Sequence, residues 1–135
     1  MAVLYLEVVT PEKVLVSREV DTVVAPGTEG EFGILPGHIP FLSGILPGEL
    51  RYEADGKKNY LAVTEGFSEV SENRVSILVD AAEKAEDIDT QRAQSALDRA
   101  RERMSRERGA EDVDFLRAEA SLRRAMIRLK VAGKA

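Results

Sequence analysis

A glycine- and proline-rich stretch from Pro26 to Gly48 constrains the fold of this 135-residue chain more than any other part of it. It holds six of the ten glycines and four of the five prolines. Proline has no N–H to donate, and glycine serves positions that need a positive φ or a close backbone approach. The stretch therefore cannot form a long helix and would make a poor central strand. Because it is also rich in apolar residues, we expect tight turns and short strands packed against a core rather than disorder.

Short apolar runs on both sides of this stretch are typical of β-strands. Turn signals separate the runs, and the Asp55-Gly56 pair is suited to a type I′ hairpin turn. Many short strands at regular spacing predict an antiparallel β-sandwich or barrel. The expected strands outside the stretch cover residues 4–9, 14–16, 20–25, 50–52, 60–64, 67–70 and 75–79.

The apolar period changes from Asp87 onward to three- and four-residue spacing, which indicates helices. We expect Asp87 to cap a first helix, Gly109 to end it and Asp112 to cap a second. Because the link between the two helices is short, they should fold back as an antiparallel hairpin. The predicted fold class is therefore α+β, with a β-sandwich over residues 1–86 followed by an α-helical hairpin over residues 87–135.

The hairpin differs from the sandwich in both packing and charge. Its apolar stripes are rich in alanine, which buries little area, so we expect it to depend on a neighbour while the sandwich folds alone. The formal charge is −8 over residues 1–86 and +3 over residues 87–135. A basic tail on an acidic body indicates either an acidic partner or a solvated helical face.

Composition excludes several classes of function. The chain has no cysteine, so it has neither disulfides nor thiolate metal sites, and we expect no metal site. No apolar run approaches the roughly 20 residues of a membrane span, and we expect no signal peptide. The net charge of −5 argues against a nucleic-acid partner. Nucleophile elbows, HExxH motifs and Walker loops are also missing from the sequence.

Two groups of residues are candidates for binding. Glu29 and Glu31 lie in the glycine-rich stretch, where exposed acids suit an interaction loop, and His38 suits a turn or packing role there. In the predicted hairpin, Asp89 and Arg92 share a helix face and could form a salt bridge or belong to a ligand site. The latter would need further basic groups for phosphate, and the hairpin supplies Arg99, Arg124 and Arg128.

Five motifs along the whole chain resemble the epsilon subunit family of bacterial and chloroplast rotary ATP synthases, which is called delta in mitochondria. They are VVTPEK (8–13), GEFGILPGHIP (30–40), GFSEV (66–70), AAEKAEDID (81–89) and RAMIRLKVAG (124–133). The resemblance implies a ten-stranded β-sandwich followed by a helical hairpin, in a non-catalytic part of the rotor. A free-standing nucleotide-binding module is the alternative, and an enzyme is a distant third.

The resemblance also implies partners. The sandwich would bind the gamma subunit and the c-ring, with Glu29, Gly30, Glu31 and His38 at these contacts. An extended hairpin would inhibit ATP hydrolysis, as its basic residues Arg123, Arg124 and Arg128 would meet the catalytic alpha/beta subunits. The protein would then lie peripherally on the cytoplasmic face of the bacterial cell membrane, held there through the complex.

A further family motif, Ile/Leu-Asp-x-x-Arg-Ala, implies ATP as a regulatory ligand, with no cofactor required. Here it is formed by Ile88, Asp89, Arg92 and Ala93. By the same resemblance, Ile88 and Ala93 would pack near the adenine, and Glu83 and Asp89 would accept hydrogen bonds from base or ribose. The arginines would hold the phosphates, namely Arg92, Arg99, Arg124 and Arg128.

Overall fold

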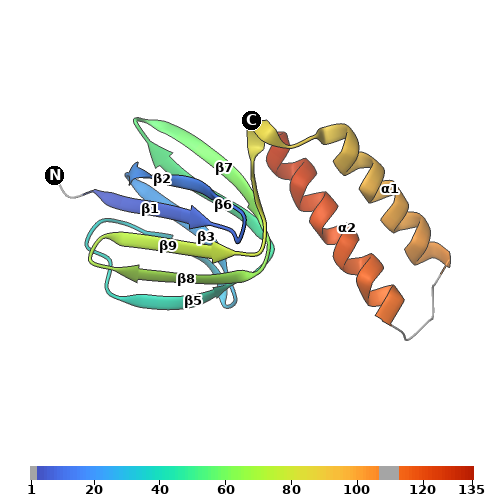
Figure 1. Cartoon of the computed structure of the whole chain (residues 1–135), viewed down its shortest axis with the longest axis horizontal. Coiled ribbons are helices and arrows are strands. Elements are labelled where there is room, and N and C mark those ends of the chain that lie inside the picture. The colour runs from blue at the N-terminus through green and yellow to red at the C-terminus, as the bar shows by residue number, and fades with distance from the viewer. Residues whose placement is uncertain (1–2, 107–112) are drawn as a thin grey trace.

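A computed structural model describes residues 3–106 and 113–135 of the chain (Figure 1). Ten strands are followed by a short 3-10 helix, η1, and two α-helices. The strands are β1 (Leu4–Val9), β2 (Val14–Val20), β3 (Thr22–Gly27), β4 (Gly30–Ile34), β5 (Phe41–Ile45), β6 (Gly48–Ala54), β7 (Lys57–Val63), β8 (Gly66–Ser71), β9 (Arg74–Val79) and β10 (Ala82–Lys84). The helical elements are η1 (Ala85–Asp87), α1 (Thr90–Arg106) and α2 (Val113–Ala132). The predicted α+β class, a β-sandwich followed by a helical hairpin, is confirmed.

The strands form one continuous sheet that folds over on itself. Its order is β10-β7-β6-β3-β5-β8-β9-β1-β2, and β4 pairs with β3 outside this path. The pairing is antiparallel except between β1 and β9, which run parallel. The sandwich is therefore not purely antiparallel. Strands β1 and β9 are far apart in the sequence, so no hairpin turn forces them to run in opposite directions.

Two hairpin turns require left-handed backbone at both central positions. Asp55 and Gly56 have φ values of 55° and 74°, as the predicted type I′ turn between β6 and β7 needs. Glu72 and Asn73, between β8 and β9, have φ values of 50° and 62°. Asn73 tolerates this conformation better than most residues, and its Oδ1 also accepts a hydrogen bond of 2.6 Å from the Gly37 N–H.

The glycine- and proline-rich stretch folds as expected into short strands and turns. It supplies the end of β3, all of β4 and β5, and the start of β6. Strand β3 pairs with β6 as far as Val24 and then reaches β5 through Gly27. Pro26 lies between these two pairings, where β3 changes its partner from β6 to β5. A residue without an N–H therefore breaks no ladder hydrogen bond on that side of β3.

Alternating inward residues from both layers build one core. Strand β1 shows the pattern most plainly, since Leu4, Leu6 and Val8 are fully buried while the residues between them are half-buried. Branched aliphatic side chains fill the rest of the space. They include Val23, Ile34, Ile45, Leu50, Leu61, Val70, Val75 and Ile77.

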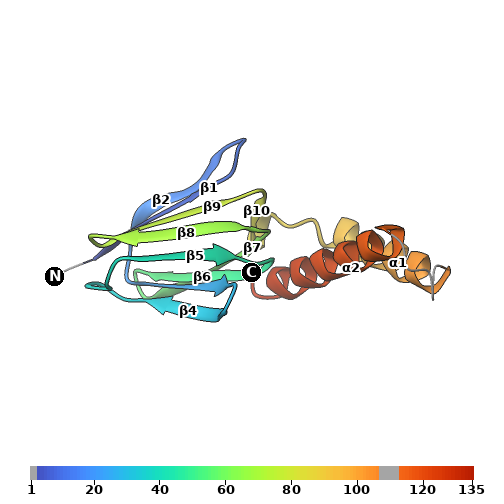
Figure 2. The same ribbon diagram turned by 90° about the horizontal axis from the view of Figure 1, so that it is seen from below.

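The two α-helices lie side by side at one end of the sandwich and extend away from it (Figures 1 and 2). Buried Ala93, Leu97 and Ala100 on α1 face α2, where Ala118 and Ala125 are also buried. The antiparallel hairpin is therefore observed, and its packing is as alanine-rich as the sequence indicates.

The start of the first helix differs from the expectation. Asp87 ends the 3-10 helix η1 instead of capping an α-helix. Asp89 is the cap, because its Oδ1 accepts a hydrogen bond of 3.0 Å from the Arg92 N–H. The short strand β10 and the 3-10 helix η1 lie just before this cap. The spacing of the apolar residues alone did not separate η1 from the helix. The predicted roles of Gly109 and Asp112 lie outside the described residues.

The hairpin touches the sandwich through the C-terminal end of α2. Val131 is fully buried there against Ala62, Ala85 and Ile88. Half-buried Tyr60, Ile127 and Ala132 surround this second, small apolar cluster. It is separate from the main core, so the hairpin docks on the sandwich without contributing to the interior of the sandwich.

Candidate functional site

A cleft of about 330 Å³ lies where the hairpin meets the sandwich. One wall comes from β7, β10 and the loops next to them, and the other from α1 and α2. Small apolar side chains, mostly alanines, form much of the lining. Glu83, Arg124 and Arg128 supply its charge. Three of the eight residues predicted for a nucleotide site therefore meet at this cleft.

Glu83 and Arg128 form a two-pronged ion pair across the cleft. Arg128 Nε donates to Glu83 Oε1 at 2.6 Å, and Nη2 donates to Oε2 at 3.1 Å. Glu83 lies on β10 and Arg128 on α2, so the pair joins the sandwich to the hairpin. A phosphate that binds Arg128 must therefore compete with this carboxylate.

Arg124 is the cleft residue best placed for an anion. Its Nη2 donates to Ser121 Oγ at 3.1 Å, one turn earlier on α2. Within the described part of the chain its guanidinium has no carboxylate partner, and the residue is exposed. An exposed guanidinium with unused donors at the mouth of an apolar cleft suits a phosphate or carboxylate group.

Three more of the predicted residues lie on the stripe of α1 that includes Ala96, which lines the cleft. Arg92 and Arg99 are four residues before and three residues after Ala96, and Asp89 is seven before it, so all share its face. Arg92 and Arg99 are exposed and make no ion pair among the described residues. Asp89 contacts the Arg92 backbone rather than its guanidinium, so the salt bridge considered from the sequence is not formed.

The other two predicted residues are used in packing. Ile88 is 8% exposed and belongs to the cluster around Val131, and Ala93 is fully buried beneath α2. In this arrangement neither presents a surface to the cleft. The sequence pattern did not distinguish these packing positions from ligand contacts, because both uses favour apolar residues.

The predicted interface residues lie on both sides of the short strand β4. Glu29, Gly30 and Glu31 lie at the turn and start of β4, and Gly30 has a φ of 113°. His38 lies beyond the other end of β4, where its N–H donates to Leu35 O and its Nδ1 is 2.7 Å from Ile39 O. The Phe41 ring lies 5.1 Å from the Phe32 ring and 5.8 Å from the His38 ring, so side chains of the same stretch connect the two groups. The assignment of these residues to an interface stays a prediction.

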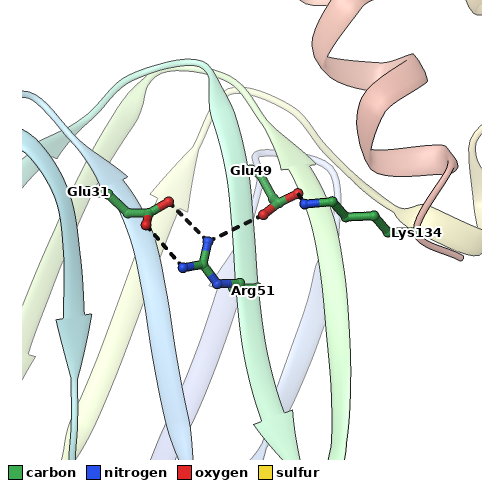
Figure 3. Close-up of polar contacts among 4 residues, drawn as sticks. All are labelled: Glu31, Glu49, Arg51 and Lys134. Atoms are coloured by element: carbon green, nitrogen blue, oxygen red, sulfur yellow. Dashed lines mark hydrogen bonds and ion pairs between the residues drawn. The ribbon is translucent and has the colours of Figure 1, made fainter.

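Glu31 is part of a charged network that sequence reasoning missed (Figure 3). Arg51 donates to both carboxylate oxygens of Glu31 at 3.0 Å, and it also lies 3.4 Å from Glu49. Hydrogen bonds from Arg51 hold the pKa of Glu31 below its usual value. Only the pairing of β4, β3 and β6 brings these positions together, so spacing in the sequence carried no signal for them.

An exposed apolar row is the second feature that sequence reasoning missed. Phe67 on β8 pairs with Leu78 on β9, which pairs with Val9 and in turn with Val14. Phe67, Leu78 and Val14 are 49%, 40% and 55% exposed. Directly paired residues share one face of a sheet, so the four form a continuous outer stripe of the kind that marks binding surfaces.

Neither a metal site nor a membrane helix is found in the described residues. In residues 3–106 and 113–135, no three His, Cys, Asp or Glu side chains gather in a way that could hold a metal ion. Nor does either described helix have the length and apolar character needed to cross a membrane.

The fold and the cleft define a class of small two-part proteins, in which a β-sandwich carries a docked α-helical hairpin. Comparison with known protein families shows which family of that class the chain matches. Residues 3–85 match the β-sandwich domain of the ATP synthase delta/epsilon chain, and residues 86–133 match its long α-helix domain. The chain belongs to this family, and the resemblance found in the sequence motifs is confirmed.

Curated relatives support the same assignment. The ATP synthase epsilon chain of Nitratidesulfovibrio vulgaris (strain DP4) is 55% identical over 102 residues, covering 76% of each chain. The one from Geotalea daltonii is 48% identical over 132 residues, covering 98% of this chain and 95% of the relative.

A solved structure supports the fold. A chain of the Euglena gracilis mitochondrial ATP synthase, a structure described as OSCP/F1/c-ring, superimposes with a TM-score of 0.83 at 24% identity. The match covers 100% of this chain and 83% of that one.

Proposed function

We propose that the chain is a non-catalytic rotor subunit of a proton-translocating ATP synthase, which joins the c-ring to gamma and restrains ATP hydrolysis through its hairpin. Family membership supports a place in the complex. The observation that carries the regulatory part is the small contact between the two halves. One small apolar cluster, separate from the main core, and a few ion pairs hold the hairpin, so it can leave the sandwich without disturbing the main core.

Two surfaces of the sandwich are suited to partners. The apolar row from Phe67 to Val14 fits an apolar protein surface, and we assign it to gamma. The exposed acids at Glu29 and Glu31 fit a basic loop, and we assign them to the c-ring. Membrane association would then be indirect, at the cytoplasmic face of the bacterial membrane.

The basic residues of the hairpin fit an acidic partner. Arg123 and Arg124 are exposed on the docked hairpin, and within the described part of the chain the ion pair of Arg123 is a long one, 3.7 Å to Glu119. Arg128 becomes free only if the hairpin leaves Glu83. We therefore infer that all three contact the catalytic alpha/beta subunits when the hairpin is extended, and so oppose hydrolysis.

The rate of ATP hydrolysis in rebuilt complexes tests this function. We expect complexes with a chain that stops after Glu86 to hydrolyse ATP faster than complexes with the full chain. Changing Arg123, Arg124 and Arg128 together to Ala should give part of that increase. Subunit occupancy is measured in each complex. Equal rates at equal occupancy would remove the inhibitory role, and failure of the full chain to assemble with gamma would favour a free-standing nucleotide-binding module.

We also propose that ATP binds the cleft of the docked hairpin and stabilises the docked state. A ligand shifts such an equilibrium only through its different affinity for the two states, and the cleft exists only while the hairpin is docked. Among the described residues the guanidiniums of Arg92 and Arg124 form no ion pair, which supports a phosphate site. Ala in place of either should weaken binding about 10- to 100-fold, because a hydrogen bond to a charged group contributes roughly 1.5–3 kcal/mol.

Calorimetry on the purified full chain measures this binding. Arg123→Ala is the matched control, because Arg123 is a neighbouring exposed arginine of α2 outside the cleft lining. Its affinity for ATP should stay near that of the unmodified chain. No heat of binding at millimolar ATP would exclude the site, and equal losses for Arg123 and Arg124 would reduce it to nonspecific charge attraction.

A further inference from the structure

Four charged side chains of alternating sign form a row that runs from the edge of the sandwich to the end of the hairpin (Figure 3). Glu31 accepts two hydrogen bonds of 3.0 Å from Arg51. Arg51 lies 3.4 Å from Glu49 Oε2, and Lys134 donates to Glu49 Oε1 at 2.6 Å. Each carboxylate oxygen of Glu49 therefore serves a different cation.

The row joins segments that are far apart in the sequence. Glu31 lies on β4, Glu49 and Arg51 lie two residues apart on one face of β6, and Lys134 follows α2. Glu49 is the central group, with its side chain only 11% exposed, whereas that of Glu31 is 53% exposed. The solvent-accessible end of the row is Glu31, on the β3–β4 hairpin, which we call the β3–β4 edge. The shielded part is Glu49, which lies beneath the end of the α-helical hairpin.

Lys134 is one of the few groups that hold the hairpin on the sandwich. Its Nζ lies 5.1 Å from the centre of the Tyr60 ring as well as beside Glu49. Among the described residues, the pair of Arg128 with Glu83 is a second ion pair between the hairpin and the sandwich. The apolar cluster between the two parts is small, with Ala62, Ala85, Ile88 and Val131 as its buried residues, so these ion pairs add to a limited apolar contact.

We propose that this row couples the β3–β4 edge to the docking of the hairpin: a cationic side chain that engages Glu31 weakens the hold of Glu49 on Lys134 and favours release. The inference rests on the hairpin movement in the proposed function. In the structure Glu31 accepts the two short hydrogen bonds of Arg51, at 3.0 Å each, and Glu49 accepts only a longer one at 3.4 Å. Lys134, at 2.6 Å, is therefore the nearer cation of Glu49. When Glu31 binds another cation, Arg51 loses its two short bonds and is free to donate more strongly to Glu49, so that Arg51 and Lys134 compete for the charge of one carboxylate.

The electrostatic attraction between Glu31 and the lysines at the end of α2 also favours the docked hairpin. Lys130 and Lys134 both lie close enough to help hold the pKa of Glu31 below its usual value, after the larger effect of Arg51. By reciprocity, the negative charge of Glu31 favours the presence of these two lysines at the docked end of α2. Neutralising Glu31 removes that attraction.

The distance between the two parts of the full chain measures the coupling. The chain has no cysteine, so Lys57→Cys on β7 and Arg101→Cys on α1 accept spin labels at two defined exposed positions. Neither position contacts the row. The fraction of molecules with a lengthened or broadened label distance then reports the detached hairpin.

In this labelled chain we expect Lys134→Ala and Glu49→Gln to raise the detached fraction several-fold and Glu31→Gln to raise it roughly 2- to 5-fold. Lys134→Arg should keep the hairpin docked, because it retains both the charge and the ring contact. Glu29→Gln is the matched control, since Glu29 is an exposed acid of the same edge outside the row. Added salt should mimic Glu31→Gln in the unmodified chain and have a smaller effect on Lys134→Ala.

If Glu31→Gln and Glu29→Gln give the same detached fraction, the coupling is overturned even if Lys134 still holds the hairpin. If Lys134→Ala leaves the distance unchanged, the row has no role in docking at all. Both outcomes are measured as label distances in the isolated chain, where ATP hydrolysis plays no part. A failure of the coupling is therefore distinguishable from a failure of the proposed inhibition, which is read from the rate of the rebuilt complex.

Discussion

Gly66, at the start of β8, is a position where a larger residue would collide with the neighbouring strand. A Cβ atom there would lie 1.9 Å from the carbonyl oxygen of Leu78 and 2.7 Å from the Cα of Val79. Both are backbone atoms of β9, which cannot move without disturbing the sheet. Gly33 on β4 contrasts with it, because a Cβ there would meet nothing nearer than a methyl group of Val24 at 3.9 Å.

Gly66→Ala should therefore destabilise the sandwich by about 1–3 kcal/mol, the usual cost of overpacking. Gly33→Ala is the control and should change the free energy of unfolding by roughly 0.5 kcal/mol or less, as at most surface positions. Urea unfolding of the two variants, followed by circular dichroism, measures the difference. Equal midpoints for the two variants would mean that β8 and β9 can separate at this point without cost.

Single residues at the cleft have structural as well as binding roles. Asp89 caps α1, Ile88 packs against Val131, and Arg128 ties α2 to Glu83. A loss of ATP binding after substitution at these positions would therefore not by itself identify a ligand contact. Arg92 and Arg124 have no such second role in ion pairing among the described residues, so they are the better probes of the site.

At the scale of the element, α1 depends on its first turn because the apolar contacts along it are small. Three alanine or leucine side chains supply its buried face, namely Ala93, Leu97 and Ala100. The carboxylate of Asp89 satisfies one of the otherwise free N–H groups at its start. A cap is worth more to such a helix than to one fixed by large apolar residues.

Asp89→Ala should destabilise α1 by about 1 kcal/mol, within the 0.5–2 kcal/mol range for lost caps. Asp89→Asn should keep most of that stability, since asparagine caps helices about as well as aspartate. Thermal loss of the helical circular dichroism signal at 222 nm compares the two. If both variants lose the same helicity, the charge of Asp89 and not its capping geometry stabilises the helix.

At the scale of the whole molecule, the two halves have separate cores. The main core draws on residues from Leu4 to Ala82, and the hairpin meets the sandwich through the small second cluster and the ion pairs of Arg128 and Lys134. The last strand ends at Lys84 and α1 begins at Thr90, so the change of secondary structure is complete within a few residues.

A chain that stops after Glu86 should therefore remain a cooperatively folding β-protein. We expect its unfolding midpoint in urea to fall only slightly below that of the sandwich in the full chain, because Ala62 and Ala85 lose their cover while the main core is unchanged. Dispersed amide resonances and a single unfolding transition are the measurements. Loss of cooperativity in the short chain would show that the sandwich needs the hairpin.

The sequence by itself determined the division into a sandwich and a hairpin, because the period of the apolar residues depends only on local backbone geometry. It also determined the Asp55-Gly56 turn, since few residue pairs tolerate a positive φ at two successive positions. The place of the helix cap was missed by two residues, as Asp87 and Asp89 are equally good caps in isolation. Only the competing η1 turn decided between them.

Tertiary structure alone decided the rest. The parallel contact of β1 with β9 and the row from Glu31 to Lys134 both depend on which strands pair. Strand pairing is a contact between distant segments, and local propensity contains no information about its partner or register. The cleft likewise arises only where α2 docks on β7 and β10, so the sequence could name its arginines but not which of them Glu83 would neutralise.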